Sequence, residues 1–136
     1  MASKYIVRHG VMRFLGEFEP AGETTYGRGA AVVVRSERGQ EIGQVLTEAQ
    51  PQIVQLLSEP THGQILRLVT TDDRKELDRL QETERQEMET CRRFIENRKL
   101  QMELVDVEHL FGGERIVFYF LAEKRVDFRE LVKDLA

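Results

Sequence analysis

The sequence has few cysteines and prolines and no tryptophan: one cysteine and three prolines occur in 136 residues. Because Cys91 stands alone, it cannot form an internal disulfide, and a zinc or iron–sulfur site would need ligands from elsewhere. No apolar run reaches the roughly 18 residues that cross a membrane, and the charged residues 1–10 lack the apolar core of a secretory signal. We therefore expect a cytoplasmic protein without membrane insertion, in which Cys91 packs in the core.

An excess of positive charge is also absent. Twenty Lys and Arg residues face twenty-four Asp and Glu residues, which gives a formal net charge of −4. Without a global cationic field the chain has no long-range attraction for nucleic acid, so the total disfavours nucleic-acid binding as the main task. The length fits a single domain over residues 1–136 that buries roughly two thirds of its unfolded surface.

The first half of the chain has the composition of short strands. β-Branched and aromatic residues, separated by Gly and Pro, mark five segments: 4–10, 11–20, 30–36, 40–46 and 65–69. The triplet Glu37-Arg38-Gly39 predicts a hairpin turn between the third and fourth segments. Gly27 and Gly29 precede a strand rather than open a helix, so they indicate a turn and not a phosphate-binding loop.

A long charged helix is predicted from residue 72 to about residue 99, a stretch without Gly or Pro. Thr70 and Thr71 precede two aspartates, which is the pattern of a capped helix N-terminus. Six apolar side chains share one side of this helix: Leu77, Leu80, Met88, Cys91, Phe94 and Ile95. Glu84 and Glu87 interrupt this stripe, so we expect the helix ends to dock on a sheet and the centre to be solvated or to face a partner.

The last third of the chain predicts a second hairpin and a closing helix. Residues 102–111 alternate, which places on one strand face Val105, Val107 and His109. The run 115–121 is apolar on both sides, as is typical of a central strand covered on both faces. A cap at Asp127 opens a helix whose apolar stripe comprises Phe128, Leu131, Val132 and Leu135. We therefore predict an α+β fold of antiparallel strands and hairpins, with one long charged helix and a C-terminal amphipathic helix packed on the sheet.

Catalytic constellations are missing from the sequence. His9, His62 and His109 stand in none of the spacings that bind metals, and His109 shares a strand face with apolar residues, which favours a satisfied core histidine over a ligand. A Cys91–His109 pair would activate a nucleophile only if the fold brought the two together, and Cys91 has apolar helix neighbours among which a thiol is inert. The sequence therefore predicts no catalytic residue, no cofactor, no metal site and no enzyme activity.

Charged residues of the long helix are the best candidates for a binding surface. Its middle and its basic end supply Glu84, Arg85, Glu87, Arg92, Arg93, Arg98 and Lys99. A second basic group comprises Lys124, Arg125 and Arg129. Clustered cations can bind nucleic acid, whereas a helix end that complements its own dipole, and a charged turn, explain the same residues without a ligand.

Three stretches carry a resemblance to a known family: residues 31–46 (AVVVRSERGQEIGQVL), 65–73 (ILRLVTTDD) and, most specific of all, 104–136. In these stretches the chain is similar to the C-terminal domain family of the polymerase suppressor protein (PSP-one), the domain of bacterial YaaT-type proteins. The resemblance covers about residues 28–136, and residues 1–27 add N-terminal strands to the same domain.

The resemblance implies a non-catalytic adaptor or regulatory protein. YaaT-type proteins form a complex with two small helical proteins that directs a membrane-associated endoribonuclease in mRNA maturation, and they are linked to sporulation, competence and biofilm control. That complex carries iron–sulfur clusters. The family has no known catalytic residue, so none is transferred to this chain, and the implied partners are small helical proteins and an endoribonuclease.

The sequence departs from the family pattern at its end. Family members continue beyond the stretch VDFRELVKDLA (126–136) into a further basic strand, and YaaT-type proteins then carry a cysteine-rich region. We therefore expect no cofactor, and an open sheet edge that a partner or a second copy of the chain would fill. The leading prediction is an adaptor in an RNA-processing or developmental regulatory complex. The alternatives are a nucleic-acid-binding module that uses the basic end of the long helix and, last, a small enzyme.

Overall fold

The chain folds into two compact units with both strands and helices, which confirms the predicted α+β class. The computed structural model describes residues 4–113, 115–127 and 129–135. The first unit, here the barrel unit, contains the chain up to Glu76 together with Leu110–Arg115. The second, the helix–hairpin unit, contains Leu77–His109 and the chain from Ile116 onward.

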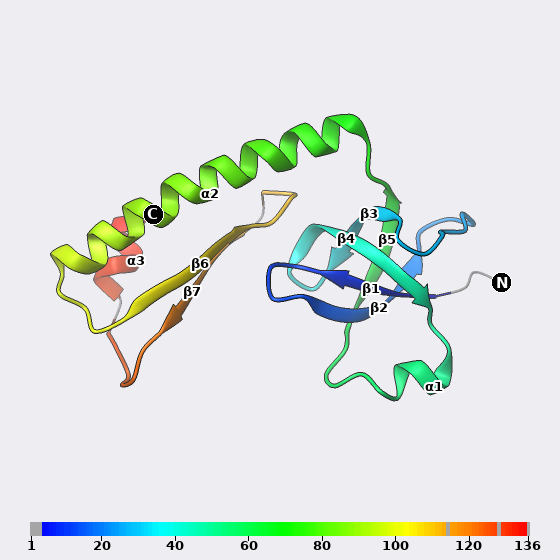
Figure 1. The fold of residues 1–136 in the computed structure, drawn as a ribbon, viewed down its shortest axis with the longest axis horizontal. Helices are drawn as coiled ribbons and strands as arrows, with labels where there is room; N and C mark the ends of the chain where they lie inside the picture. Colours follow the sequence, from blue (N-terminus) through cyan, green and yellow to red (C-terminus); the bar gives the residue numbers. More distant parts are fainter. Residues whose placement is uncertain (1–3, 114, 128, 136) are drawn as a thin grey trace. The chain divides into compact units, whose positions relative to one another are not determined.

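A closed five-stranded barrel makes up most of the barrel unit (Figure 1). Its strands are β1 (Tyr5–His9), β2 (Phe14–Pro20), β3 (Ala31–Ser36), β4 (Gly39–Glu48) and β5 (Thr61–Leu68). They close in the order β1-β2-β5-β3-β4. The predicted hairpin is confirmed, because Ser36 pairs with Gly39 across the turn between β3 and β4. The short helix α1 (Pro51–Val54) lies between β4 and β5 in the chain.

One strand pair departs from the predicted antiparallel pattern. β2 and β5 run parallel, with Gly16 opposite Thr61 and Pro20 opposite Ile65. A parallel pair needs a crossover connection rather than a tight turn, and here the β3–β4 hairpin and α1 lie between the two strands in the chain. The composition of a strand gives no information on the direction of its neighbour, so the sequence did not predict this pair.

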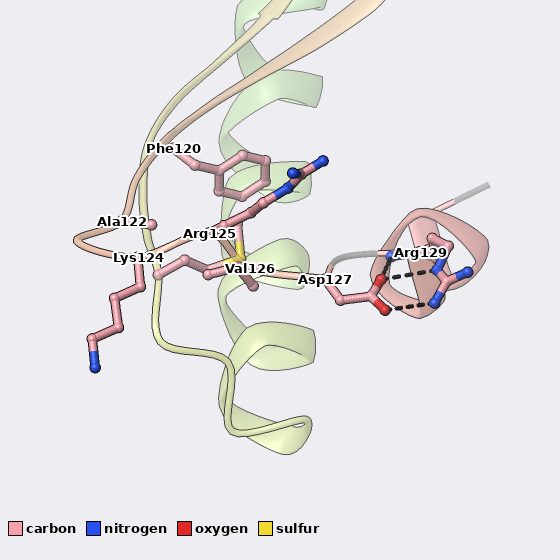
Figure 2. A pocket seen from close by; sticks show the side chains of 8 residues that line it. Phe120, Ala122, Lys124, Arg125, Val126, Asp127 and Arg129 are labelled. Carbon is pink, nitrogen blue, oxygen red and sulfur yellow. Dashed lines mark hydrogen bonds and ion pairs between the residues drawn. The ribbon is translucent and has the colours of Figure 1, made fainter.

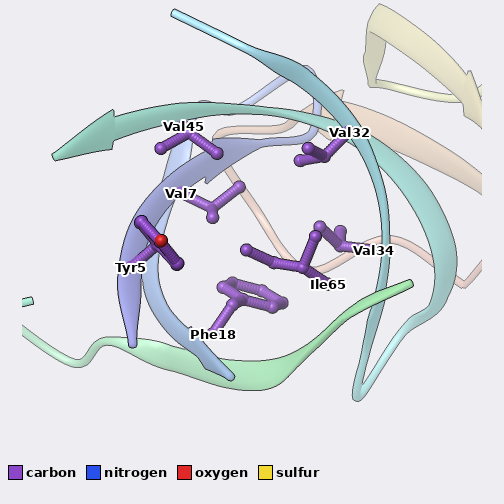
Figure 3. Close-up of a cluster of buried hydrophobic side chains, with 7 residues drawn as sticks. All are labelled: Tyr5, Val7, Phe18, Val32, Val34, Val45 and Ile65. Carbon is purple, nitrogen blue, oxygen red and sulfur yellow. The ribbon is translucent and has the colours of Figure 1, made fainter. Parts of the chain in front are cut away.

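Alternate side chains of the five strands fill the barrel. Figure 3 shows this cluster, in which every member is at most 1% exposed: Tyr5, Val7, Phe18, Val32, Val34, Val45 and Ile65. Tyr26 packs against it with its ring edge-on to Tyr5, at a centroid distance of 5.7 Å. Burial of each such side chain stabilises the fold by about 1.5–3 kcal/mol relative to an exposed one.

Two glycines allow β2, β3 and β5 to approach one another. A Cβ atom on Gly63 would lie 2.0 Å from the backbone oxygen of Arg35 and 2.8 Å from the Phe18 ring. A Cβ atom on Gly16 would lie 2.6 Å from the backbone oxygen of Thr61. Both positions therefore require glycine for close packing, since backbone atoms cannot move aside as a flexible side chain can.

The long helix α2 (Thr71–Asn97) begins at the cap that the sequence predicts. The Thr70 backbone N–H donates to Asp73 Oδ2 (2.8 Å), and the Asp73 N–H donates to Thr70 Oγ1 (3.2 Å). Arg67 of β5 donates to the same carboxylate, with 3.0 Å between Nη2 and Oδ1. The hydrogen bonds from Arg67 and Thr70 hold the pKa of Asp73 well below its usual range, so this cap stays charged.

The helix–hairpin unit combines α2 with β6 (Glu103–His109), β7 (Ile116–Leu121) and α3 (Arg129–Leu135). Its buried cluster comprises Cys91, Ile95, Leu104, Val107 and Leu131. Cys91 is fully buried, which confirms the prediction that it packs in the core. Burial also raises the pKa of its thiol, and a protonated thiol is a poor nucleophile.

Three sequence-based expectations in this unit were wrong or incomplete. β7 is not a central strand: it pairs with β6 in a two-stranded sheet, and Ile116 and Leu121 are 48% and 65% exposed. The alternation in β6 breaks at a register shift between Leu104 and Asp106, so Val105 is exposed and Glu108 is buried. In α3, Leu131 is buried but Val132 is exposed, and Phe128 of the predicted stripe lies outside the described residues.

The close approach at Gly63 generates a stability prediction. The substitution Gly63→Ala should lower the free energy of unfolding by about 1–3 kcal/mol, because the added methyl group overpacks against the Arg35 backbone. The matched control is Gly27→Ala, where a Cβ would meet no heavy atom within 4 Å and the change should stay below about 1 kcal/mol. Urea unfolding followed by circular dichroism measures both, and equal effects of the two substitutions would contradict the described packing.

Candidate functional site

One end of the barrel interior is polar rather than apolar. His9 Nδ1 lies 3.1 Å from Glu41 Oε1, and His9 Nε2 lies 2.7 Å from Thr61 Oγ1. Ser36 donates a hydrogen bond to the other carboxylate oxygen of Glu41, and Arg38 Nη1 lies 3.7 Å from Oε1. The His9 and Glu41 side chains are 0% and 3% exposed. The sequence analysis missed this cluster, because its members come from four different strands and the turn between β3 and β4.

The electrostatics of this cluster favour a charged Glu41. Burial alone would raise the pKa of the Glu41 carboxyl, but hydrogen bonds from His9 and Ser36, and the positive charge of His9 and Arg38, lower the pKa below its ordinary value. A buried carboxylate with such partners is electrostatically satisfied. The cluster therefore closes one end of the barrel core with paired charges.

A hydroxyl, an imidazole and a carboxylate in this order are also the parts of a nucleophilic triad. The surroundings of His9 argue against that use. Its ring packs against the rings of Phe14 and Phe18, at centroid distances of 5.7 and 5.3 Å. The backbone of β2 covers the hydroxyl, because a Cβ atom on Gly16 would lie 2.1 Å from Thr61 Oγ1. A reacting group needs a free position about 3 Å from the nucleophile, and β2 takes up that space.

A second imidazole joins α2 to β6 in the helix–hairpin unit. His109 Nε2 lies 2.7 Å from Glu87 Oε2, and the His109 backbone N–H donates to Glu84 Oε1 (2.8 Å). Burial raises the pKa of Glu84 above its ordinary value, although the bond from His109 opposes that shift. Glu84 and Glu87 are half-buried against β6, whereas the sequence analysis expected the centre of the helix to be solvated or to face a partner. His109 is satisfied, as predicted.

The other predicted surface residues of α2 do face solvent. Arg85, Arg92, Arg93, Arg98 and Lys99 are all exposed. Arg85 pairs with Glu82 at 3.0 Å, and Arg98 donates to Asp134 of α3, with 2.8 Å between Nη2 and Oδ1. These contacts tie Arg98 to its own unit. Arg92, Arg93 and Lys99 are the cations of the predicted basic end that make no ion pair with any residue the structure describes.

A cavity of about 870 Å³ lies beside the loop between β7 and α3 (Figure 2). Its apolar lining includes Met102, Phe120 and Val126, and its polar lining includes Lys124 and Arg125. The two remaining charged residues of the lining neutralise each other: Arg129 donates to Asp127 at 3.0 and 2.7 Å. The sequence analysis named these three cations as a second basic group, but it gave no sign that they border a cavity.

The part of the chain that the structure describes contains neither a metal-binding cluster nor a helix that could cross a membrane. Within residues 4–113, 115–127 and 129–135, no group of three His, Cys, Asp or Glu side chains is placed to hold a metal ion. In the same ranges, no helix combines the length and the apolar character that a membrane crossing requires.

Comparisons with known proteins agree on one family. The model of the PSP1 C-terminal conserved region matches residues 63–136, just over half of the chain. Stage 0 sporulation protein YaaT of Bacillus subtilis is 35% identical over 113 residues, which cover 79% of this chain and 38% of that protein. An uncharacterised protein of Schizosaccharomyces pombe is 28% identical over 130 residues, which cover 76% of this chain and 17% of that protein.

The match therefore spans well under half the length of either curated relative. No solved structure matches the chain. The family match and the Bacillus relative bear out the resemblance seen in the sequence. This chain belongs to the family of the PSP1 C-terminal conserved region.

Proposed function

We propose that this chain is a non-enzymatic adaptor that binds protein partners in a regulatory complex. The observation that carries the proposal is that some charged groups of the chain are paired and covered by protein, whereas others are exposed to solvent. The His9–Glu41 pair is buried, and the His109–Glu87 pair is largely covered, with 11% and 31% of the two side chains exposed. Arg92, Arg93 and Lys99, in contrast, stand exposed on α2 and in the turn after it. Enclosed groups stabilise a scaffold and exposed ones are available to a partner.

The setting of this activity comes from the relatives. The Bacillus relative is named as a stage 0 sporulation protein, so we extend a role in developmental regulation to this chain. The family resemblance adds mRNA maturation as the process, and small helical proteins and an endoribonuclease as partners. Both extensions rest on similarity and on the exposed face of α2.

The pattern of charges on α2 suits a charged partner helix. Residues seven apart lie on the same helix face, within about 20°, and the exposed Arg85 and Arg92 of α2 have this spacing. Lys99 follows them in the turn after the helix. Three residues before each one stands an exposed glutamate: Glu82, Glu89 and Glu96. A surface on which negative and positive side chains alternate favours a partner whose charges alternate in the complementary order.

Direct nucleic-acid binding is the weaker candidate for this face. Arg92, Arg93 and Lys99 favour it, because free cations bind phosphates. However, Glu89 and Glu96 lie among them, and a phosphate backbone has no positive charge to pair with these carboxylates. The face therefore resembles a protein-binding surface more than a phosphate-binding one.

A chimera tests the proposed surface. The segment of Bacillus YaaT that aligns with this chain is replaced by the chain itself, and sporulation frequency is measured in a strain that lacks YaaT. We expect the chimera to sporulate, and the variant R92E/R93E to lower the frequency by at least about tenfold, because reversed charges repel a complementary partner. The matched control R74E/K75E reverses two exposed charges at the other end of α2 and should sporulate like the parent chimera.

Two results would contradict the proposal. If R92E/R93E sporulates as well as R74E/K75E, the basic end of α2 is not the partner surface. If the folded parent chimera fails to sporulate, the chain does not share the developmental role of its relative. Circular dichroism of the purified chains separates loss of folding from loss of binding in either case.

Glu84 generates a separate prediction on pH dependence. Because the folded-state pKa of Glu84 is raised above 4.5, the folded protein holds this proton more tightly than the unfolded chain does. The stability that Glu84 contributes therefore falls as the pH rises above 4.5. Glu84→Gln keeps an oxygen that accepts from the His109 N–H, and it removes the half-buried charge.

We expect Glu84→Gln to raise the Tm at pH 7 by about 2–4 °C, and to leave the Tm at pH 4 close to that of the parent. The exposed Glu89 on the same helix supplies the matched control, Glu89→Gln, which should change the Tm little at either pH. Differential scanning calorimetry measures the three chains. A Tm of E84Q below that of E89Q at pH 7 would mean that the Glu84 charge stabilises the fold.

A further inference from the structure

We propose that the cavity between β7 and α3 binds a short acidic segment of a partner protein. An apolar side chain of the segment enters the cavity, and neighbouring carboxylates pair with Lys124 and Arg125. The proposal rests on the proposed function as a protein-binding adaptor, and it adds a second contact site and the chemistry of the partner.

The shape and lining of the cavity fit a peptide side chain. Its volume of about 870 Å³ falls in the range of about 300–1,000 Å³ that is usual for ligand sites. Met102, Phe120 and Val126 give it an apolar lining. In Figure 2, Phe120, Arg125 and Val126 lie close together, so an apolar group held there would have a positive charge beside it.

The charges around the cavity favour an anionic ligand. Lys124 and Arg125 are exposed and make no ion pair with the described residues. Arg129 is neutralised by Asp127, as the dashed lines in Figure 2 mark. Two unpaired cations next to an apolar lining therefore offer one or two carboxylates a pairing that the chain itself does not supply.

Acidic neighbours favour a protein segment over RNA. The adjoining hollow is lined by Glu103 and Glu123, and Glu130 lies on the α3 side with Lys133 as its partner. Single-stranded RNA carries a phosphate on every nucleotide and binds to grooves that track its backbone with positive charge. Here such a strand would run from two cations onto the carboxylates of Glu103 and Glu123 on one side. On the α3 side it would meet Arg98, Arg129 and Lys133 already interspersed with Asp127 and Glu130. A protein segment avoids this repulsion, because it can place its acidic residues only at Lys124 and Arg125.

Peptide titration of the ¹⁵N-labelled full chain by NMR tests the proposal. The probe is the capped peptide EELFELEE, which joins an apolar centre to acidic flanks. Three comparison ligands separate the contributions: KKLFKLKK reverses the charge, EEGSEGEE removes the apolar groups, and an eight-nucleotide oligo(U) represents RNA. We expect saturable shifts of the Phe120, Arg125 and Val126 amide signals with EELFELEE, and none with the other three at the same concentrations.

Three chain variants give the matched comparison. K124E/R125E should weaken EELFELEE binding by at least about tenfold, and K124Q/R125Q should weaken it by a smaller factor. R92E/R93E, on the other proposed surface, should bind the peptide like the parent. All four substituted positions are exposed, and the ¹⁵N spectrum itself reports whether each variant is folded.

Each contrary result overturns the proposal in a distinct way. If no saturable shift appears up to about 2 mM EELFELEE, the cavity does not bind acidic peptides with an apolar centre. Equal binding of KKLFKLKK removes the role of the two cations, and preferential binding of oligo(U) assigns the cavity to RNA. Because the sporulation chimera tests Arg92 and Arg93 independently, peptide failure with a working chimera leaves the proposed function intact. If the peptide binds but the chimera is inactive, the cavity binds this ligand class and the proposed developmental role is wrong.

Discussion

The pairing of imidazoles with carboxylates, buried at His9 and partly buried at His109, is the constraint on which the two units depend. An unpaired charge in a protein interior costs several kcal/mol, so a buried charge persists only with partners. His9 meets Glu41 inside the barrel, and Ser36, Arg38 and Thr61 complete that cluster. His109 meets Glu87, with Glu84 on its backbone N–H. Each pair joins elements that are distant in sequence: β1 with β4, and β6 with the middle of α2.

This use of polar groups bears directly on function. Side chains that resemble catalytic parts are already bound to one another, with aromatic rings and strand backbone around them. The fully buried Cys91 has no exposed surface on which to react. Exposed cations that make no ion pair with the described residues lie, among other places, at the end of α2 and beside the cavity near α3. This arrangement supports the proposal that the exterior of the chain binds partners.

Local sequence signals predicted the local structure well. The cap at Thr70 and Asp73, the helix α2, the β3–β4 hairpin and the buried Cys91 all follow from short-range patterns. The parallel β2–β5 pair, the register shift in β6 and the edge position of β7 depend on neighbours that lie far away in the chain. The PSP1 family itself came from recognised motifs and not from periodicity. Its partners and process remain proposals.

The sequence contains a signal for the polar end of the barrel, because the inward rows of two strands each end on a polar residue. In β1 the inward positions are Tyr5, Val7 and His9, and in β3 they are Val32, Val34 and Ser36. In both strands the row of inward side chains ends on a buried polar residue. A polar residue at the end of an inward row predicts a partner in a neighbouring strand, and Glu41 on β4 supplies it. The identity of that partner could not be predicted without the strand order.

The enclosure of the imidazoles is tested most directly by the reaction of the three histidines with diethyl pyrocarbonate, which acylates exposed, unprotonated imidazole nitrogens. Mass spectrometry of the native chain gives the rate at each site. The account predicts that the exposed His62 reacts first, that His109, with 11% of its side chain exposed, is slower, and that His9 is protected by at least about tenfold until the barrel opens. A His9 that reacts as fast as His62 in the folded protein would show an imidazole open to small reactants, and it would contradict the view of this chain as a closed, non-catalytic scaffold.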